Sequence, residues 1–289
     1  MNKKLNIIFM VMLIVVSSFC LTTFGAGSKT QAQAETQTTV MAYCDDTFYS
    51  ELATQSVETE TISYSRKEVT QYVINTSFPN YYNSNASLTN TCANVGGANV
   101  VGYYDRYYDD LIPNCTVGIT RSNRYTYYPM NINNDKIQSV IDKLYTSMKT
   151  NTKENGTSEE DCLNGLKTYV QSQGRSITYT STMANNALNL DKFDSQLKEG
   201  NPVMLFLSGY NFVSLADSGS KASISKDVYS GNHIVVAYGY QKVDYYNAGN
   251  TLIKSYTYIY VSTGINGVSG FYLLNGGGKM DAAQAVAIK

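Results

Sequence analysis

The sequence predicts an α+β domain in which a helical half comes first, an antiparallel β-sheet half follows, and a cleft lies between them. Helical periodicity dominates from Cys92 to about residue 200. Beyond that point the periodic segments are rich in Val, Ile and Tyr, which is typical of strands. Helices that precede strands in this way are typical of the segregated layers of α+β folds.

The helical half begins with a segment whose apolar residues recur at helical spacing on one face. Its third helix has its own start signal, because Thr157-Ser158-Glu159-Glu160 fits a capping box. The predicted elements of this half are helices over Cys92–Tyr108, Asn134–Met148, Thr157–Gly174 and Leu190–Glu199, and a strand over Ser176–Thr182.

The sheet half is predicted from four runs of β-branched and aromatic residues: Val203–Leu207, His233–Val243, Leu252–Ser262 and Phe271–Leu274. Between the first two runs, Ser208 to Gly231 has no strong periodicity, so we expect loops there that line the cleft.

The N-terminal part differs from the rest of the chain. Residues 1–34 carry two early lysines, an apolar run and the sequence Ala32-Gln33-Ala34, which predicts a secretory signal peptide; an uncleaved membrane anchor is the alternative. Residues 35–75 are rich in Thr, Gln, Glu and Ser, which favours a linker or a removable pro-segment with no stable element before Tyr72. The folded domain is then 76–289, in a protein of bacterial type that is secreted to the extracellular space, with no membrane contact after cleavage of the signal.

Composition excludes several classes of function. The net charge of −1 gives no electrostatic case for nucleic acid or an anionic membrane. The single histidine removes most metal-hydrolase designs, so we expect neither a metal nor another cofactor. The sequence contains no HExxH or GxSxG motif and no phosphate-binding loop. What remains is a pairing of the one histidine with a thiol or a hydroxyl.

Cys92 is the candidate nucleophile. It lies where a polar loop meets the first predicted helix, and the partial positive charge of a helix N-terminus stabilises a thiolate. The same helix contains Gly96, Gly97 and Gly102, each costing about 1 kcal/mol relative to Ala, which indicates close approach by a neighbouring element. The alternative interpretation is a buried structural cysteine.

His233 is the candidate base. It follows Ser230-Gly231-Asn232 and opens the run His-Ile-Val-Val-Ala-Tyr-Gly-Tyr, so a turn places it at the start of a buried strand. A strand end holds an imidazole rigidly while leaving it within reach of a nucleophile at about 3 Å. The alternative is a histidine whose hydrogen bonds are satisfied at a sheet edge.

Together these motifs resemble the C39-like family of papain-fold cysteine peptidases. Asn90-Thr91-Cys92 through Tyr103-Tyr104-Asp105 matches the family's nucleophile motif, and Gly231-Asn232-His233 through Gly239-Tyr240 matches its histidine motif. Gly200-Asn201-Pro202-Val203 is similar to its strand entry. The resemblance spans about Phe78 to the C-terminus and implies a papain-like form of the α+β fold.

Three departures from the family pattern concern the site. Cys92-Ala93-Asn94-Val95 replaces the family's Cys-Gly-Pro-Thr. The oxyanion-hole glutamine of the family corresponds by its spacing from Pro79 to Asn83, a shorter amide. The residue that orients the imidazole corresponds to Thr263, with Asn266 as the nearest residue of the expected chemistry.

The expected function is hydrolysis of peptide bonds in a protein or peptide substrate by a Cys92–His233 pair. The alternative is a catalytically inactive homologue that acts as a secreted or surface binding protein. In an oxidising compartment we expect Cys115 to pair with Cys162, while Cys92 stays reduced and Cys44 lies in the linker.

Overall fold

The computed structural model describes residues 56–74, 78–108, 110–113, 115, 134–153, 155–266, 270–274 and 276–289. The predicted signal peptide, the first part of the predicted linker and Cys44 lie outside these residues.

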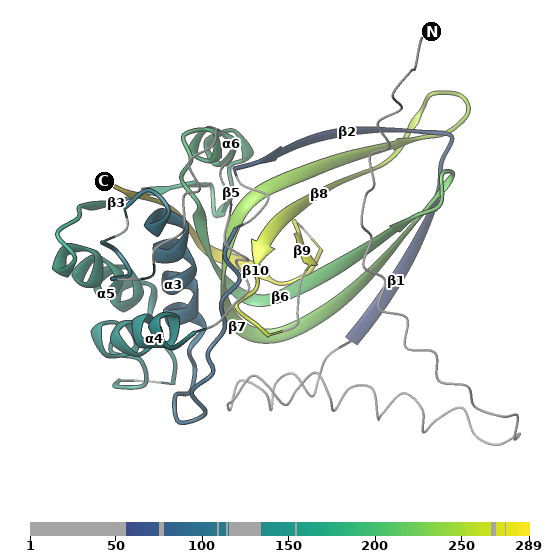
Figure 1. The fold of residues 1–289 in the computed structure, drawn as a ribbon. Helices are drawn as coiled ribbons and strands as arrows, with labels where there is room; N and C mark the ends of the chain where they lie inside the picture. Colours follow the sequence, from purple (N-terminus) through teal and green to yellow (C-terminus); the bar gives the residue numbers. More distant parts are fainter. Residues whose placement is uncertain are drawn as a thin grey trace, which may run out of the picture. The chain divides into compact units, whose positions relative to one another are not determined.

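The largest element is an antiparallel sheet of eight strands with the order β1-β7-β8-β9-β6-β10-β3, in which β2 also pairs with β7 (Figure 1). Its strands are β1 (Ser56–Ser63), β2 (Arg66–Val73), β3 (Ile177–Ser181), β6 (Val203–Asp217), β7 (Lys221–Tyr246), β8 (Leu252–Ser262), β9 (Gly270–Leu273) and β10 (Lys279–Ile288). A separate pair consists of β4 (Met183–Ala184) and β5 (Ala187–Leu188).

Strand β7 organises this sheet because it is 26 residues long and has different partners along its length. Residues 221–228 pair with β1, and residues 239–246 pair with β2. Strand β6 pairs with its first two thirds, and β8 pairs from Val236 onward. One strand therefore connects both β1 and β2 to the rest of the sheet.

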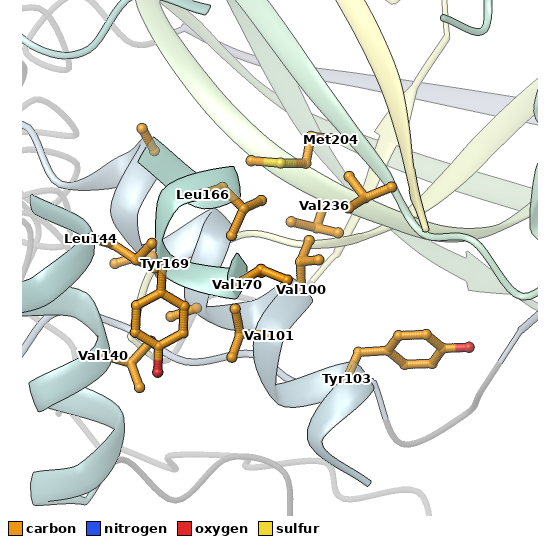
Figure 2. Packing of buried hydrophobic residues seen from close by; sticks show 14 of the residues in the cluster. Val100, Val101, Tyr103, Val140, Leu144, Leu166, Tyr169, Val170, Met204 and Val236 are labelled. Atoms are coloured by element: carbon orange, nitrogen blue, oxygen red, sulfur yellow. The ribbon is translucent and has the colours of Figure 1, made fainter. Parts of the chain in front are cut away.

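The helices are α3 (Cys92–Asp105), α4 (Asp135–Ser147), α5 (Glu159–Ser172) and α6 (Leu190–Lys198). Figure 1 shows α3, α4 and α5 grouped together beside the sheet, with α6 apart from them. Apolar side chains of α3 and α5 meet Met204 and Val236 of the sheet, as Figure 2 shows.

The middle of the sheet is buried on both faces. Ile234 and Val236 of β7 belong to the cluster that contains α3, whereas Val235 and Ala237 belong to the cluster that contains Phe193 of α6. Because alternate residues of a strand point to opposite faces, both sets must be apolar. This explains why the sequence reads as a continuous apolar run at this point.

Close helix packing depends on glycine. A Cβ atom at Gly165 of α5 would lie 2.6 Å from Cα of Met148, so no side chain fits there. A Cβ at Gly97 of α3 would lie 2.9 Å from Cε of the same methionine. Glycines therefore let α3 and α5 approach the end of α4.

Local signals place the helix ends. Asn134 caps α4, as its side chain accepts hydrogen bonds from Lys136 N and Ile137 N. The capping box of α5 lies one residue later than predicted: Oγ of Ser158 accepts from Asp161 N and donates to the Asp161 carboxylate.

The predicted fold class is wrong. The protein is mostly antiparallel sheet, and its first two strands precede every helix of the described chain, so it does not divide into a helical half and a sheet half with a cleft between them. The papain-like architecture implied by the resemblance is therefore also wrong. The strands that the prediction missed are β1, β2, β4, β5 and β10, together with the extensions of β6 and β7 through Ser208–Gly231.

The reason is that several missed strands are polar. Strand β1 reads SVETETIS and β2 reads RKEVTQYV, and most of their side chains are exposed. They supply few apolar residues but include Thr and Val, which favour extended backbone. The expectation of no stable element before Tyr72 is therefore also wrong.

Within the described residues, no helix is long and apolar enough to cross a membrane.

Candidate active site

Cys92 is the first residue of α3 and is half-buried. Thr91 occupies the N-cap position without a side-chain capping bond, and its carbonyl accepts the first helical hydrogen bond from Val95 N at 2.9 Å. The N-terminal dipole of α3 is therefore not countered by a capping side chain of Thr91, and no acidic residue lies in the first turn.

The three glycines of α3 have different neighbours. A Cβ at Gly96 would lie 3.4 Å from Cγ2 of Ile234, so this glycine faces the sheet. Gly97 faces α4 and α5, and a Cβ at Gly102 would collide with the ring of Tyr81. Gly96 alone faces the sheet, and a Cβ there would lie at an ordinary contact distance, so close approach is seen at Gly97 and Gly102 and not against the sheet.

The predicted position of His233 at the start of a strand is wrong, because β7 already begins at Lys221 and includes Ser230–Asn232. His233 lies within β7, opposite Leu207 of β6 and next to the bulge in β6 between Ser208 and Tyr210. The ring stacks on Tyr210 at a centroid distance of 4.9 Å, on the face of the sheet opposite Ile234. It is 5% exposed. Burial lowers the pKa of His233 to about 4, an effect that its hydrogen bond to Thr263 partly opposes.

The hydrogen bond of His233 fixes its tautomer. Nε2 lies 2.9 Å from the main-chain oxygen of Thr263. A carbonyl oxygen only accepts hydrogen bonds, so Nε2 carries the proton and donates it. In the neutral imidazole that burial favours, Nδ1 is then the basic nitrogen.

The segment after β8 links this imidazole to α3. Thr263 bonds to His233, and the next residue, Gly264, has a positive φ of 73°. A Cβ at Gly264 would lie 3.1 Å from Cγ1 of Val95, in the first turn of α3 after Cys92. The structure thus brings His233 and Thr263 together and places Gly264, the residue after Thr263, against the first turn of α3.

The other predicted site residues have different surroundings. Asn83 donates both amide hydrogens within its own loop, to the carbonyls of Asn85 at 2.9 Å and Leu88 at 3.2 Å, while its Oδ1 accepts from Gln138. Asn266 is half-buried and forms no hydrogen bond with His233 in the described part of the chain. The hydrogen bond at Nε2 of His233 is made to the main chain of Thr263.

Two residues of this region were not predicted. Ser262 and Asn80 are joined by a hydrogen bond from Oγ of Ser262 to Oδ1 of Asn80 at 2.9 Å. The same oxygen accepts from Gly264 N at 3.3 Å. Asn80 directly follows Pro79, whereas the family spacing counted from Pro79 pointed to Asn83.

The predicted Cys115–Cys162 disulfide is wrong, because the structure leaves both thiols unbridged. Cys162 is fully buried in the helical cluster, and burial first and a nearby Cys92 second raise its pKa. Cys115 is half-buried beside Asp105 and Asn134, where burial raises its pKa. The two residues face different neighbours, so the loop between them is not closed.

No three His, Cys, Asp or Glu side chains cluster in a way that could hold a metal ion in the portion of the chain that the structure describes. Comparison with protein-family models, with curated proteins and with solved structures finds no match to this chain.

Proposed function

We propose that the protein is a cysteine peptidase in which Cys92 is the nucleophile and His233 is the general base. The observation that carries this proposal is the bond from His233 Nε2 to Thr263 O, which orients the only imidazole of the chain. The contact between Gly264 and Val95 brings the same segment to the first turn of α3. The motif resemblance to C39-like cysteine peptidases supports the same assignment.

The chemistry follows from the protonation states. Because burial lowers the pKa of His233 to about 4, the resting imidazole is neutral at pH 7 and Nδ1 can accept a proton. As Sγ of Cys92 attacks the peptide carbonyl carbon, its proton passes to Nδ1 and the carbonyl π electrons move to oxygen. The proposal therefore requires Sγ of Cys92, which packs against the α3 cluster, to reach Nδ1 of His233, whose ring lies on the face of the sheet opposite Ile234.

The remaining steps regenerate the enzyme. The imidazolium gives its proton to the amide nitrogen, the C–N bond breaks, and an acyl thioester remains on Cys92. Water then attacks the thioester while Nδ1 takes its proton, and cleavage of the C–S bond releases the acid and restores the thiol. The buried, disfavoured imidazolium exists only between these transfers.

The oxyanion formed in each step needs donors. We assign one to the main-chain N–H of Cys92, in the first turn of α3. Asn83 is the predicted second donor, and reaching the oxyanion would require its amide to give up one of its two hydrogen bonds to the loop. We place the reaction outside the cell, on a protein or peptide substrate, because residues 1–34 are predicted to be a signal peptide.

Selective alkylation tests this function. At neutral pH we expect iodoacetamide to modify Cys92 at least about tenfold faster than Cys115, another half-buried thiol, with the rates read by peptide mass spectrometry. Fully buried Cys162 serves as an unreactive internal control. His233→Gln should reduce the Cys92 rate to that of Cys115.

A mixed peptide library, incubated with the wild-type protein and with Cys92→Ala, provides the second readout. Cleavage that is lost in Cys92→Ala supports the peptidase. Equal alkylation of Cys92 and Cys115, with no cleavage, would instead favour an inactive homologue with a binding role.

A further inference from the structure

We infer that Asn80 is a positioning residue, which holds the Ser262–Gly264 segment so that the main-chain oxygen of Thr263 meets the His233 imidazole. This inference rests on the proposed function for its catalytic meaning. The orientation of the His233 imidazole by the Asn80 side chain does not depend on that function, because it follows from the hydrogen bonds of Asn80 to Ser262 and Gly264.

Asn80 accepts hydrogen bonds from the residues on both sides of Thr263. Its Oδ1 accepts from Oγ of Ser262 at 2.9 Å and from the main-chain N of Gly264 at 3.3 Å. The Gly264 N–H belongs to the same peptide unit as the Thr263 carbonyl, so its bond to Asn80 restrains the plane of that unit, while the other bond holds the side chain of Ser262. The direction of the Thr263 carbonyl, and therefore the place of its oxygen, depends on them.

These two hydrogen bonds of Asn80 lie just past the end of the regular β7–β8 pairing. Ser262 is the last residue of β8 and pairs with Val236, and beyond it the chain turns at Gly264 with a positive φ. Pairing with β7 therefore does not hold Thr263 in place. A side-chain acceptor replaces the missing ladder at this point.

Asn80 can act as a clamp because its own backbone is held on both sides. The ring of Phe78 stacks between Tyr238 of β7 at 4.9 Å and Tyr103 of α3 at 5.1 Å. On the other side, the main-chain N of Tyr81 donates to Oδ1 of Asn99 in α3 at 2.6 Å. The segment 78–81 thus contacts both α3 and the sheet. Because this segment is held in place, the side chain of Asn80 can hold the residues on either side of Thr263.

The single histidine makes this testable without reference to activity. In protein labelled with ¹⁵N-histidine, a long-range ¹H–¹⁵N spectrum contains the signals of His233 alone and reports which nitrogen is protonated. We expect the Nε2–H tautomer in the wild type. In Asn80→Ala we expect averaged signals of both tautomers and a lowered imidazole pKa, because the bond to Thr263 raises this pKa against the effect of burial.

Two variants serve as controls. Asn80→Asp keeps an oxygen that accepts from Ser262 and Gly264, so it should retain the wild-type spectrum. Asn83→Ala removes a nearby asparagine whose bonds stay in its loop and in α4, so it should also leave His233 unchanged. If Asn80→Ala does not fold, Ser262→Ala removes the shorter of the two bonds and takes its place.

The outcomes separate the two proposals. If Asn80→Ala and Ser262→Ala both keep a pure Nε2–H tautomer, the positioning role is wrong, whatever the activity. If the tautomer changes but the wild type shows no selective alkylation and no cleavage, the positioning role holds and the proposed function is wrong. If both hold, Asn80→Ala should lower kcat by about tenfold with KM within about twofold.

Discussion

The imidazole of His233 in β7 and the main-chain oxygen of Thr263, the first residue after β8, lie 2.9 Å apart across the end of a strand pair. A buried imidazole is thereby oriented by an atom that every amino acid possesses. Four expectations follow from this relationship and from the packing around it.

Acidification should destabilise the protein through His233. The folded protein keeps this imidazole neutral down to a pKa of about 4, whereas the unfolded chain protonates it near the ordinary pKa of 6.5. The unfolded state therefore binds more protons, and the free energy of unfolding falls as the pH drops through 6.5 and levels off below 4. Between pH 7 and pH 5 the loss should be about 2 kcal/mol.

Urea unfolding at both pH values measures this effect. His233→Gln is the control, because the chain contains no other histidine. The difference in unfolding free energy between pH 7 and pH 5 should be smaller in the variant by that amount. An equal change in unfolding free energy between pH 7 and pH 5 in the two proteins would contradict a depressed pKa of His233.

Thr263→Ala should preserve most of the peptidase activity. The group that meets His233 is the carbonyl of Thr263, which alanine keeps; the Thr263 side chain accepts from Ile265 N instead. We expect kcat/KM to fall by less than about fivefold, against about 10²- to 10⁴-fold for loss of the base in His233→Gln. A loss in Thr263→Ala as large as that in His233→Gln would show that the hydroxyl, not the carbonyl, is required.

Gly165→Ala should destabilise the helical cluster, while Gly96→Ala should not. The added methyl at Gly165 meets the backbone of Met148, which cannot move cheaply, so we expect a loss of about 2 kcal/mol in denaturant unfolding. At Gly96 the nearest atom is at an ordinary contact distance of 3.4 Å. The higher helix propensity of alanine should then stabilise this variant by up to about 1 kcal/mol. Equal effects at the two positions would refute the packing described for α4 and α5.

Strands β1 and β2 should be required for stability, not dispensable as a removable pro-segment would be. Ile62 of β1 is 4% exposed in a cluster with Val213 of β6 and Tyr258 of β8. Ile62→Ala should therefore cost about 2–4 kcal/mol. Val57→Ala, on the same strand but 57% exposed, should cost less than about 0.5 kcal/mol. Comparable losses in the two variants would mean that the strand does not bury one face.

Local signals predicted the helices well because periodicity and capping act within a few residues. Helix α3 begins at the predicted Cys92, and Asn134 caps α4. Strand β8 has its predicted bounds because its flanks differ clearly in composition. The extent of the sheet was missed because β1 and the first part of β7 bury only occasional residues, and their pairing partners lie far away in the sequence.

The site was predictable to the same extent. The local contexts of Cys92 and His233 singled them out as residue types. The partner of His233 was located at Thr263 only by the resemblance, and a main-chain acceptor leaves no trace in residue identity. Asn83 had the right side chain at the expected spacing, but its neighbour Asn85 and the Leu88 carbonyl engage it in a local turn. Such competition is decided by loop geometry, which spacing does not contain.

The pairing of β7 also constrains how fast the protein can form. Strand β1 joins residues near 221–228, and β2 joins residues 239–246, so the first strands to be synthesised lack their partners until more than 150 residues have followed. Contacts of such long sequence separation slow folding, because loop closure comes before any gain from pairing. Until then both strands present unpaired edges. Their Glu, Lys and Thr residues, which made these strands hard to predict from the sequence, also discourage edge-to-edge aggregation.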